Sequence, residues 1–134
     1  SGAALSLNAM GKIDRNYLSD AFVFNPKDGW KKLPPMPRPC VAAPSPAIFN
    51  KGGIQLFSGD DGKLVNFEPK QSHPGFPKSS LIYDSKSNSW AKELPFHLSR
   101  ATVPLTSWQG LHVLISGEVR PGIRTPEIWS MRQR

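Results

Sequence analysis

The sequence predicts an all-β protein assembled from repeated four-stranded units. Two segments of the chain carry the same landmarks in the same order, which indicates an internal repeat. Between the landmarks lie short runs rich in Val, Ile, Phe and Trp, separated by Pro, Gly, Asn and Asp, as is typical of strands and turns. No segment has a convincing helical spacing of apolar residues. Together these observations favour a turn-rich β architecture.

The repeat contains an aromatic residue with a polar neighbour, a turn, a tryptophan, a Leu-Pro pair, an arginine and a Ser-Gly pair. The first copy has Phe24-Asn25, Trp30, Leu33-Pro34, Arg38 and Ser58-Gly59, and the second has Tyr83-Asp84, Trp90, Leu94-Pro95, Arg100 and Ser116-Gly117. A repeat of about 50 residues with four strands is typical of a blade of a Kelch-type β-propeller. We expect both tryptophans to pack between blades, because large aromatic side chains usually belong to cores.

The strands follow from the apolar runs and their flanking turn residues. We expect them at Asp20–Asn25, Gly29–Leu33, Val41–Phe49, Ile54–Ser58, Ser79–Asp84, Ser89–Leu94, Ala101–Trp108, Leu111–Ser116 and Thr125–Met131. Within a blade they are labelled a to d. Residues 1–38 then hold strands c and d of one blade, with Ala3–Asn8 as a candidate strand b. Residues 39–98 form a complete blade, and residues 99–134 form most of a third.

An incomplete set of blades leaves apolar faces uncovered and strand edges unpaired. Propellers close into rings of four to eight blades, so two to three blades cannot form a ring alone. We therefore expect the remaining blades to come from the same longer chain or from associated chains.

The charge composition bears on the kind of ligand. Seventeen Lys and Arg against ten Asp and Glu give the 134 residues a net charge of +7 and a pI near 9.9, which favours an anionic partner. The basic residues are scattered, without the runs typical of nucleic-acid binding, so we expect no nucleic-acid partner. The single cysteine, Cys40, excludes an internal disulfide. No stretch approaches the length of a membrane span, and we expect no metal or other cofactor.

One end of the propeller gathers charged loop residues. Successive strands of a blade are antiparallel, so the b–c and d–a loops emerge at the same end. This places Asp60, Asp61, Glu118, Arg120 and Arg124 from b–c loops with Arg38 and Arg100 from d–a loops. In the stretch GEVRPGIRT, the turn at Pro121-Gly122 lets Glu118 approach Arg124. Such a pair can move protons and hold a carboxylate, or it can be a surface ion pair of little energetic value.

The long b–c loop at residues 59–78 offers a further candidate, His73. A loop histidine can carry a proton or donate a hydrogen bond, although a lone one often does neither. Asp60-Asp61-Gly62 lacks the further ligands of a calcium loop, so a turn is the favoured interpretation there.

Three stretches resemble one known family, the Kelch-like N-acetylneuraminate epimerases, or sialic acid mutarotases, including their cyclically permuted members. These stretches are LSDAFVFNPKDGW, SSLIYDSKSNSW and above all ISGEVRPGIRTPEIW, which is similar to the family's Gly-Glu-x-x-Pro-Gly-x-Arg-Thr motif. The similarity spans about Leu18–Met131 and about a third of a family chain. It implies a six-bladed ring and a periplasmic or secreted location, although the sequence itself leaves the compartment unknown.

The resemblance also implies the chemistry. It assigns Glu118 and Arg124 as catalytic residues in the interconversion of the α and β anomers of sialic acid by acid/base ring opening. Arg38, Arg100, Arg120 and His73 are the expected substrate-binding residues, with a small anionic sugar as ligand. Two other interpretations stay open: a non-catalytic Kelch module that binds protein or glycan through its loop face, and a structural part of a larger ring without activity of its own.

Overall fold

The computed structural model describes residues 1–50, 52–91 and 93–132. Its strands are β1 (Ala3–Leu7), β2 (Ile13–Tyr17), β3 (Phe22–Asn25), β4 (Gly29–Lys32), β5 (Ile48–Asn50), β6 (Gly53–Phe57), β7 (Ser79–Asp84), β8 (Ser89–Trp90), β9 (Leu94–Pro95), β10 (Leu105–Trp108), β11 (Leu111–Ile115), β12 (Glu118–Arg120), β13 (Ile123–Arg124) and β14 (Ile128–Arg132). One turn of 3-10 helix, η1, spans Lys70–Ser72. The predicted all-β class is confirmed.

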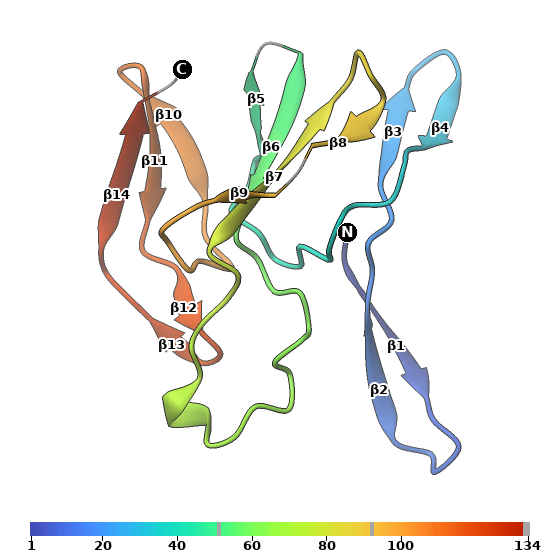
Figure 1. The fold of residues 1–134 in the computed structure, drawn as a ribbon, viewed down its shortest axis with the longest axis vertical. Coiled ribbons are helices and arrows are strands. Elements are labelled where there is room, and N and C mark those ends of the chain that lie inside the picture. The colour runs from blue at the N-terminus through green and yellow to red at the C-terminus, as the bar shows by residue number, and fades with distance from the viewer. Residues whose placement is uncertain (51, 92, 133–134) are drawn as a thin grey trace.

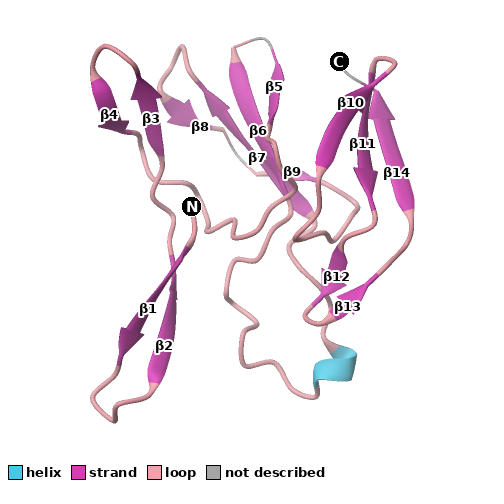
Figure 2. Ribbon diagram, turned by 180° about the vertical axis from the view of Figure 1, so that it is seen from behind, coloured by secondary structure: helices cyan, strands magenta, loops and turns pink. Residues whose placement is uncertain are grey.

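Three antiparallel sheets stand side by side, each corresponding to one blade. β3 pairs with β4 in the first, and β10-β11-β14 form the third. The middle sheet has the order β5-β6-β7, with both β8 and β9 paired to β7. Figures 1 and 2 show these sheets grouped at one end, while the β1–β2 hairpin, the η1 loop and the β12–β13 hairpin extend toward the other. The chain is thus an open, partial β-propeller.

Strand a of the middle blade is shorter than the sequence predicts. The expectation was Val41–Phe49, but the regular strand is β5, and Val41 makes only an isolated bridge. Pro44 and Pro46 lack the N–H that a ladder requires. In addition, Ala42 lies in the left-handed region with φ of 51°.

Strand a of the third blade begins late for the same reasons. Ala101–Trp108 was expected, whereas β10 begins at Leu105, directly after Pro104. Thr102 has φ of 52°, matching Ala42 in the blade before. The expected strand Ser89–Leu94 is divided between β8 and β9, and Lys92 within it lies outside the described residues.

The interpretation of Ala3–Asn8 as strand b of the first blade is wrong. β1 pairs with β2 rather than with β3, so the two form a hairpin of their own. Both strands are exposed nearly throughout, because the hairpin extends away from the sheets. It occupies the position of a b–c loop.

Backbone hydrogen bonds identify that position. Leu18 N donates to Gly2 O, as Thr125 N donates to Gly117 O in the third blade. Ser1-Gly2 is therefore a third copy of the Ser-Gly landmark, which the sequence comparison did not include.

The match of Arg38 with Arg100 is also wrong, by two residues. Val41 bridges Asp60, and Ala101 bridges Glu118 in the same antiparallel way. Because Val41 and Ala101 are therefore equivalent, the residue in the place of Arg100 is Cys40 rather than Arg38.

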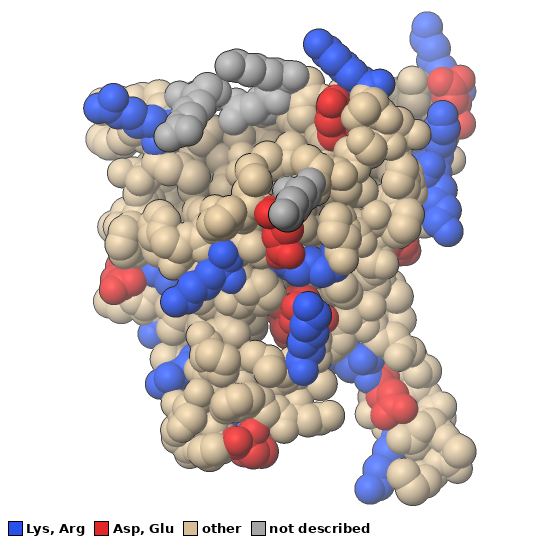
Figure 3. All heavy atoms as spheres, viewed as in Figure 1, with Lys and Arg blue, Asp and Glu red and all other residues tan. Residues whose placement is uncertain are grey.

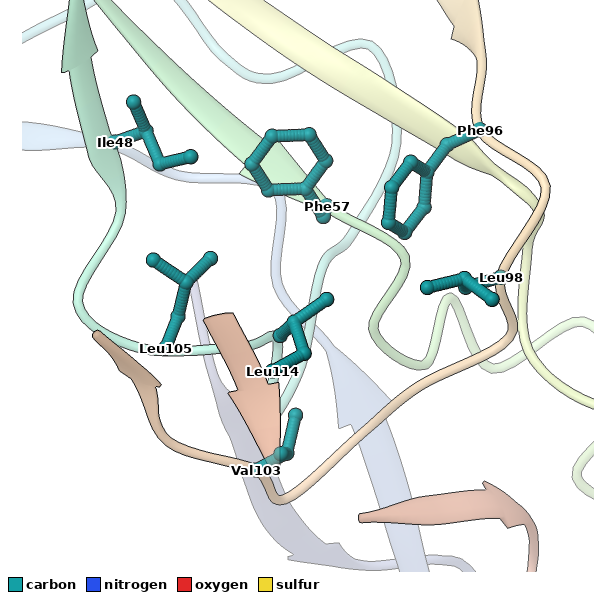
Figure 4. Packing of buried hydrophobic residues seen from close by; sticks show 7 residues of the cluster. All are labelled: Ile48, Phe57, Phe96, Leu98, Val103, Leu105 and Leu114. Carbon is teal, nitrogen blue, oxygen red and sulfur yellow. The ribbon is translucent and has the colours of Figure 1, made fainter. Parts of the chain in front are cut away.

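The main core lies between the middle and third blades. Its buried members come from both blades and from the connection between them, and they are Ile48, Phe57, Phe96, Leu98, Val103, Leu105 and Leu114. Figure 4 shows their side chains converging from the facing elements. The rings of Phe57 and Phe96 have centroids 4.8 Å apart. Apolar burial here holds neighbouring blades together and so fixes the relative position of their loops.

A second core joins the first and middle blades. Met36, Cys40 and Leu81 are buried, and Trp90 packs against them. The Trp90 indole also donates its N–H to Pro34 O at 2.9 Å. The prediction that this tryptophan packs between blades is confirmed. Trp30, its counterpart in the first blade, lies on an open face and is 72% exposed.

Candidate functional site

Three b–c loops gather at one end of the molecule, and we name them by blade: the first loop (residues 3–21), the second loop (60–78) and the third loop (118–127). Tyr17 joins the first loop to the second by donating its hydroxyl to Asp60 Oδ2 at 3.1 Å. Its ring lies against Gly62, where an added Cβ would come within 2.4 Å of the ring. Only glycine permits this contact.

Ser99 joins the second loop to the third. Phe76 N donates to Ser99 Oγ at 2.7 Å, and Ser99 Oγ donates to Val119 O at 2.6 Å. At Gly75 an added Cβ would lie 2.7 Å from the Val119 carbonyl oxygen. The loops are therefore packed against each other rather than independent.

A cleft of about 390 Å³ opens among the three loops. It is lined by Arg15 and Tyr17 of the first loop, by Asp60, Leu64, Val65, Lys70 and His73 of the second, and by Pro121 and Gly122 of the third. A neighbouring cleft of about 490 Å³ lies within the second loop and shares Asp60, Leu64 and His73 with it. In Figure 3, Lys and Arg side chains alternate with Asp and Glu across the visible face instead of forming a patch of one sign.

Asp60 and Glu118 occupy equivalent positions in neighbouring blades. Each directly follows a Ser-Gly pair and bridges the entry to strand a through its backbone. Each carboxylate also accepts from a glycine N–H of its own turn, Gly62 N to Asp60 Oδ1 at 2.9 Å and Gly122 N to Glu118 Oε1 at 2.6 Å. Both carboxylates are thus oriented by local turn geometry.

Glu118 and Arg124 are Cα partners at the base of the β12–β13 hairpin. Glu118 is half-buried and Arg124 is exposed. The ion pairs among the described residues are Arg38–Glu93, Lys63–Asp61 and Arg100–Glu127, so Glu118 and Arg124 form none with each other. Within the described part of the chain, the Arg124 guanidinium is exposed and takes part in no ion pair, so it can meet a ligand. In the same hairpin, Arg120 Nε is buried and finds no hydrogen-bond partner among the described residues.

Arg38 is 5% exposed, and its guanidinium is occupied by the protein itself. It donates to Ser58 O, to Ser79 O and Oγ, and to Glu93 Oε1 at 2.6 Å. Burial of Glu93 tends to raise its pKa, but hydrogen bonds from Ser79 and Arg38 outweigh this effect, and the pKa of that carboxyl lies below its usual value. Arg38 therefore ties the start of β7 to the entry of its blade.

Arg100 does the equivalent in the third blade. It is 3% exposed and donates to Ser99 O and, at 2.8 Å, to Glu127 Oε2. Hydrogen bonds from Trp129 and then Arg100 lower the pKa of Glu127. Arg100 Nε remains buried without a partner. The expected substrate-binding role of both arginines stays a prediction.

His73 is buried in the second loop beside Phe67. Gly75 N donates to its Nδ1 at 3.0 Å, which leaves Nε2 as the ring nitrogen that can donate to a ligand. The ring lines both clefts, where it can donate a hydrogen bond to a ligand oxygen.

The sequence interpretation missed Arg15 and Tyr17, because residues 3–17 were not recognised as a b–c loop. Burial raises the pKa of the Tyr17 hydroxyl, and the rise persists against the opposing Arg15 guanidinium because the Asp60 carboxylate adds to it. Tyr17 is therefore a neutral hydroxyl at ordinary pH. The third Ser-Gly pair was the signal that could have found this loop.

No metal centre is evident in the described part of the chain, where no three His, Cys, Asp or Glu side chains gather closely enough to hold an ion. Across the same residues, no helix has the length and apolar character needed to cross a membrane.

Comparison with known proteins finds relatives that share one name. No protein-family model matches the chain. The N-acetylneuraminate epimerase of Haemophilus influenzae (strain 86-028NP) is 29% identical over 148 residues, which cover 92% of this chain and 39% of the relative. The protein of the same name from Brucella melitensis is 27% identical over 135 residues, which cover 80% and 35%. The resemblance to the N-acetylneuraminate epimerases is confirmed.

The chain spans about 39% of the length of the Haemophilus N-acetylneuraminate epimerase that it matches. The N-acetylneuraminate epimerase of Yersinia enterocolitica is 36% identical over a shorter stretch of 56 residues. Among solved structures, that of YjhT matches with a TM-score of 0.69 at 18% identity, covering 98% of this chain and 45% of YjhT. At that identity the likeness concerns the fold, and it agrees with a partial propeller.

Proposed function

We propose that this chain carries part of the active site of a sialic acid mutarotase, which interconverts the α and β anomers of N-acetylneuraminate. The observation that carries the proposal is the third loop: Glu118 and Arg124 are Cα partners across β12 and β13 and, among the described residues, form no ion pair with each other. The overall similarity to the named epimerases supports it. A carboxylate and an unoccupied guanidinium at one hairpin suit an anionic sugar that exchanges protons.

The reaction opens and recloses a pyranose at its anomeric carbon. Glu118 takes the proton of the anomeric hydroxyl while the bond from the anomeric carbon to the ring oxygen breaks, and the ring oxygen gains a proton. After rotation about the adjacent bond, the hydroxyl attacks the other face of the carbonyl, and the two proton transfers reverse. Arg124 holds the carboxylate of the sugar, for which the planar guanidinium can supply two parallel hydrogen bonds.

The other candidate residues support these two. Arg120, in β12 of the hairpin, has a buried Nε with no partner among the described residues. His73 can donate from Nε2 into the cleft among the three loops. Arg38 and Arg100 act indirectly in this proposal, because their guanidinium groups already bind the protein's own acceptors. They hold the loops in place and contribute positive potential.

The test is proton NMR of freshly released α-N-acetylneuraminate, followed as it converts to the β anomer with the full-length protein. We expect acceleration over buffer, and Glu118→Gln to lower kcat about 100-fold or more, because positioned acid/base groups contribute on that scale. Arg124→Gln is expected mainly to raise KM. Glu68→Gln is the matched control, since Glu68 is exposed and lies in none of the ion pairs.

Two other outcomes would count against catalysis at this site. Unchanged turnover in Glu118→Gln would remove Glu118 from the chemistry. A wild-type protein that binds the sugar without accelerating its conversion would favour the non-catalytic binding module.

A further inference from the structure

Tyr17 is the innermost residue of an otherwise exposed hairpin. The side chains of β1 and of Ile13–Asn16 are exposed, whereas Tyr17 is half-buried and lines the cleft among the three loops. The first loop thus reaches the cleft from a different blade than the one that carries Glu118 and Arg124.

The hydroxyl of Tyr17 is fixed in both position and polarity. Its proton is directed at Asp60 Oδ2, while the other carboxylate oxygen of Asp60 is held by Gly62 N. The ring rests on Gly62, which leaves it no room to move in that direction. The Tyr17 proton is committed to Asp60, and the Arg15 guanidinium lies beside the same oxygen. A phenolic oxygen has two lone pairs, so beside Arg15 it can still accept a hydrogen bond from a ligand hydroxyl.

The remaining lining of the cleft suits an anionic, polyhydroxylated ligand. Arg15 and Lys70 bring two positive charges, and Asp60 brings one negative charge that is already hydrogen-bonded. The opposite wall is the Pro121-Gly122 turn, which Glu118 closes through Gly122 N. A sugar in the cleft would therefore lie between the turn of the catalytic hairpin and Tyr17.

We infer that Tyr17, oriented by Asp60, is a substrate-positioning residue that accepts a hydrogen bond from a sugar hydroxyl remote from the anomeric carbon. The inference rests on the proposed function for the identity of the sugar. Because the Tyr17 hydroxyl takes no part in proton transfer, it acts on substrate binding and leaves the chemical step to Glu118.

Tyr17→Phe in the full-length protein tests this role, with KM and kcat measured separately. We expect KM to rise about three- to tenfold, the effect of one neutral hydrogen bond, while kcat and its pH profile stay unchanged. Asp60→Ala should raise KM similarly. The KM of the double variant should not exceed the larger of the two single-variant values, because both substitutions disrupt the same hydrogen-bonded unit.

Tyr83→Phe is the matched control. Tyr83, the other tyrosine of this chain, donates its hydroxyl to Asn88 in the β7–β8 turn and does not line the three-loop cleft. Both Phe variants lose one structural hydrogen bond, so a comparable small drop in melting temperature is expected of both. The rise in KM is expected of Tyr17→Phe alone.

The outcomes separate the two proposals. An active wild type whose Tyr17→Phe variant keeps the same KM would overturn the positioning role and leave the mutarotase proposal intact. An inactive wild type that binds the sugar would overturn the mutarotase proposal, and calorimetric affinities of the same variants would then decide the role of Tyr17. A wild type that neither binds nor converts the sugar would overturn both.

Discussion

Arg38 and Arg100 are loop arginines whose guanidinium groups bind acceptors of the protein itself. Each guanidinium is buried at the entry of a blade and reaches the start of strand c of that blade, β7 or β14. A buried guanidinium is tolerated only when carbonyl and carboxylate oxygens replace its water. Glu93 and Glu127 supply the charge, and both have lowered pKa values. The carboxylates are therefore needed in their ionised form.

This predicts a specific pH dependence for Glu93→Gln. Because the pKa of Glu93 is lower in the folded protein than in the unfolded chain, its contribution to stability is present above the unfolded value of about 4.5. The contribution is lost as pH falls through the folded pKa. We expect the variant to be less stable than wild type by about 1 kcal/mol at pH 7, the usual scale for a half-exposed pair.

Urea unfolding from pH 7 down to pH 3 measures this dependence. The difference between Glu93→Gln and wild type should shrink below about pH 4. Glu68→Gln serves as the control and should follow wild type throughout. A difference that stays constant across this range would contradict the proposed ionic contribution of Glu93.

At the scale of elements, the candidate site depends on loops that are fitted to each other. The second loop meets the first at Gly62 and the third at Gly75, and in both places a side chain would collide with its neighbour. Both glycines also have positive φ, 77° and 99°. Close approach and backbone conformation therefore both require glycine at these contacts.

Gly75→Ala is expected to loosen the second loop from the third. The added methyl would press on the Val119 carbonyl and on Ser99 Oγ, neither of which can move without breaking the Phe76–Ser99–Val119 hydrogen bonds. Gly110→Ala is the control, because Gly110 also has a positive φ, 73° against 99° at Gly75, but has open space around it. Backbone strain alone costs about 1–2 kcal/mol in either variant.

Amide hydrogen exchange across residues 60–78 reports the difference. Faster exchange in this loop is expected for Gly75→Ala and not for Gly110→Ala. Equal exchange in the two variants would mean that the contact with Val119 does not hold the loop.

The elements also show how far sequence reasoning reached. Tryptophans, hairpin turns and Ser-Gly pairs have local signals, so the sheets and the Glu118–Arg124 turn could be predicted. The start of strand a could not be predicted. The segment before it makes only isolated β-bridges and contains residues with positive φ, so no regular ladder marks where the strand begins. Tyr17 was missed because its partners, Asp60 and Gly62, are more than forty positions away along the chain.

For the whole molecule, the outer faces of the first and third blades are its main unpartnered surfaces. On one, the exposed rings of Phe24 and Trp30 have centroids 5.2 Å apart and are tilted to each other. On the other, Trp108, Ile115 and Ile128 are exposed. In the middle blade the equivalent pair, Tyr83 and Trp90, is covered by the preceding segment. We expect further blades to cover the outer faces in the same way.

A chain limited to these 134 residues should therefore self-associate and bind an apolar dye such as ANS, because the outer faces of its first and third blades expose large apolar side chains. Light scattering and dye fluorescence measure the two effects, and Trp30→Thr should reduce the fluorescence. A monodisperse monomer that binds no dye would contradict this expectation.

The free-standing β1–β2 hairpin has a consequence for how ligand choice could be changed. It pairs with no other strand among the described residues, yet its last residue lines the cleft. Its length and sequence can vary without disturbing any sheet, while the turn that holds Glu118 stays untouched. If the proposed function holds, exchanging this hairpin between related proteins would change the ligand contacts of the cleft and leave the Glu118–Arg124 hairpin as it is.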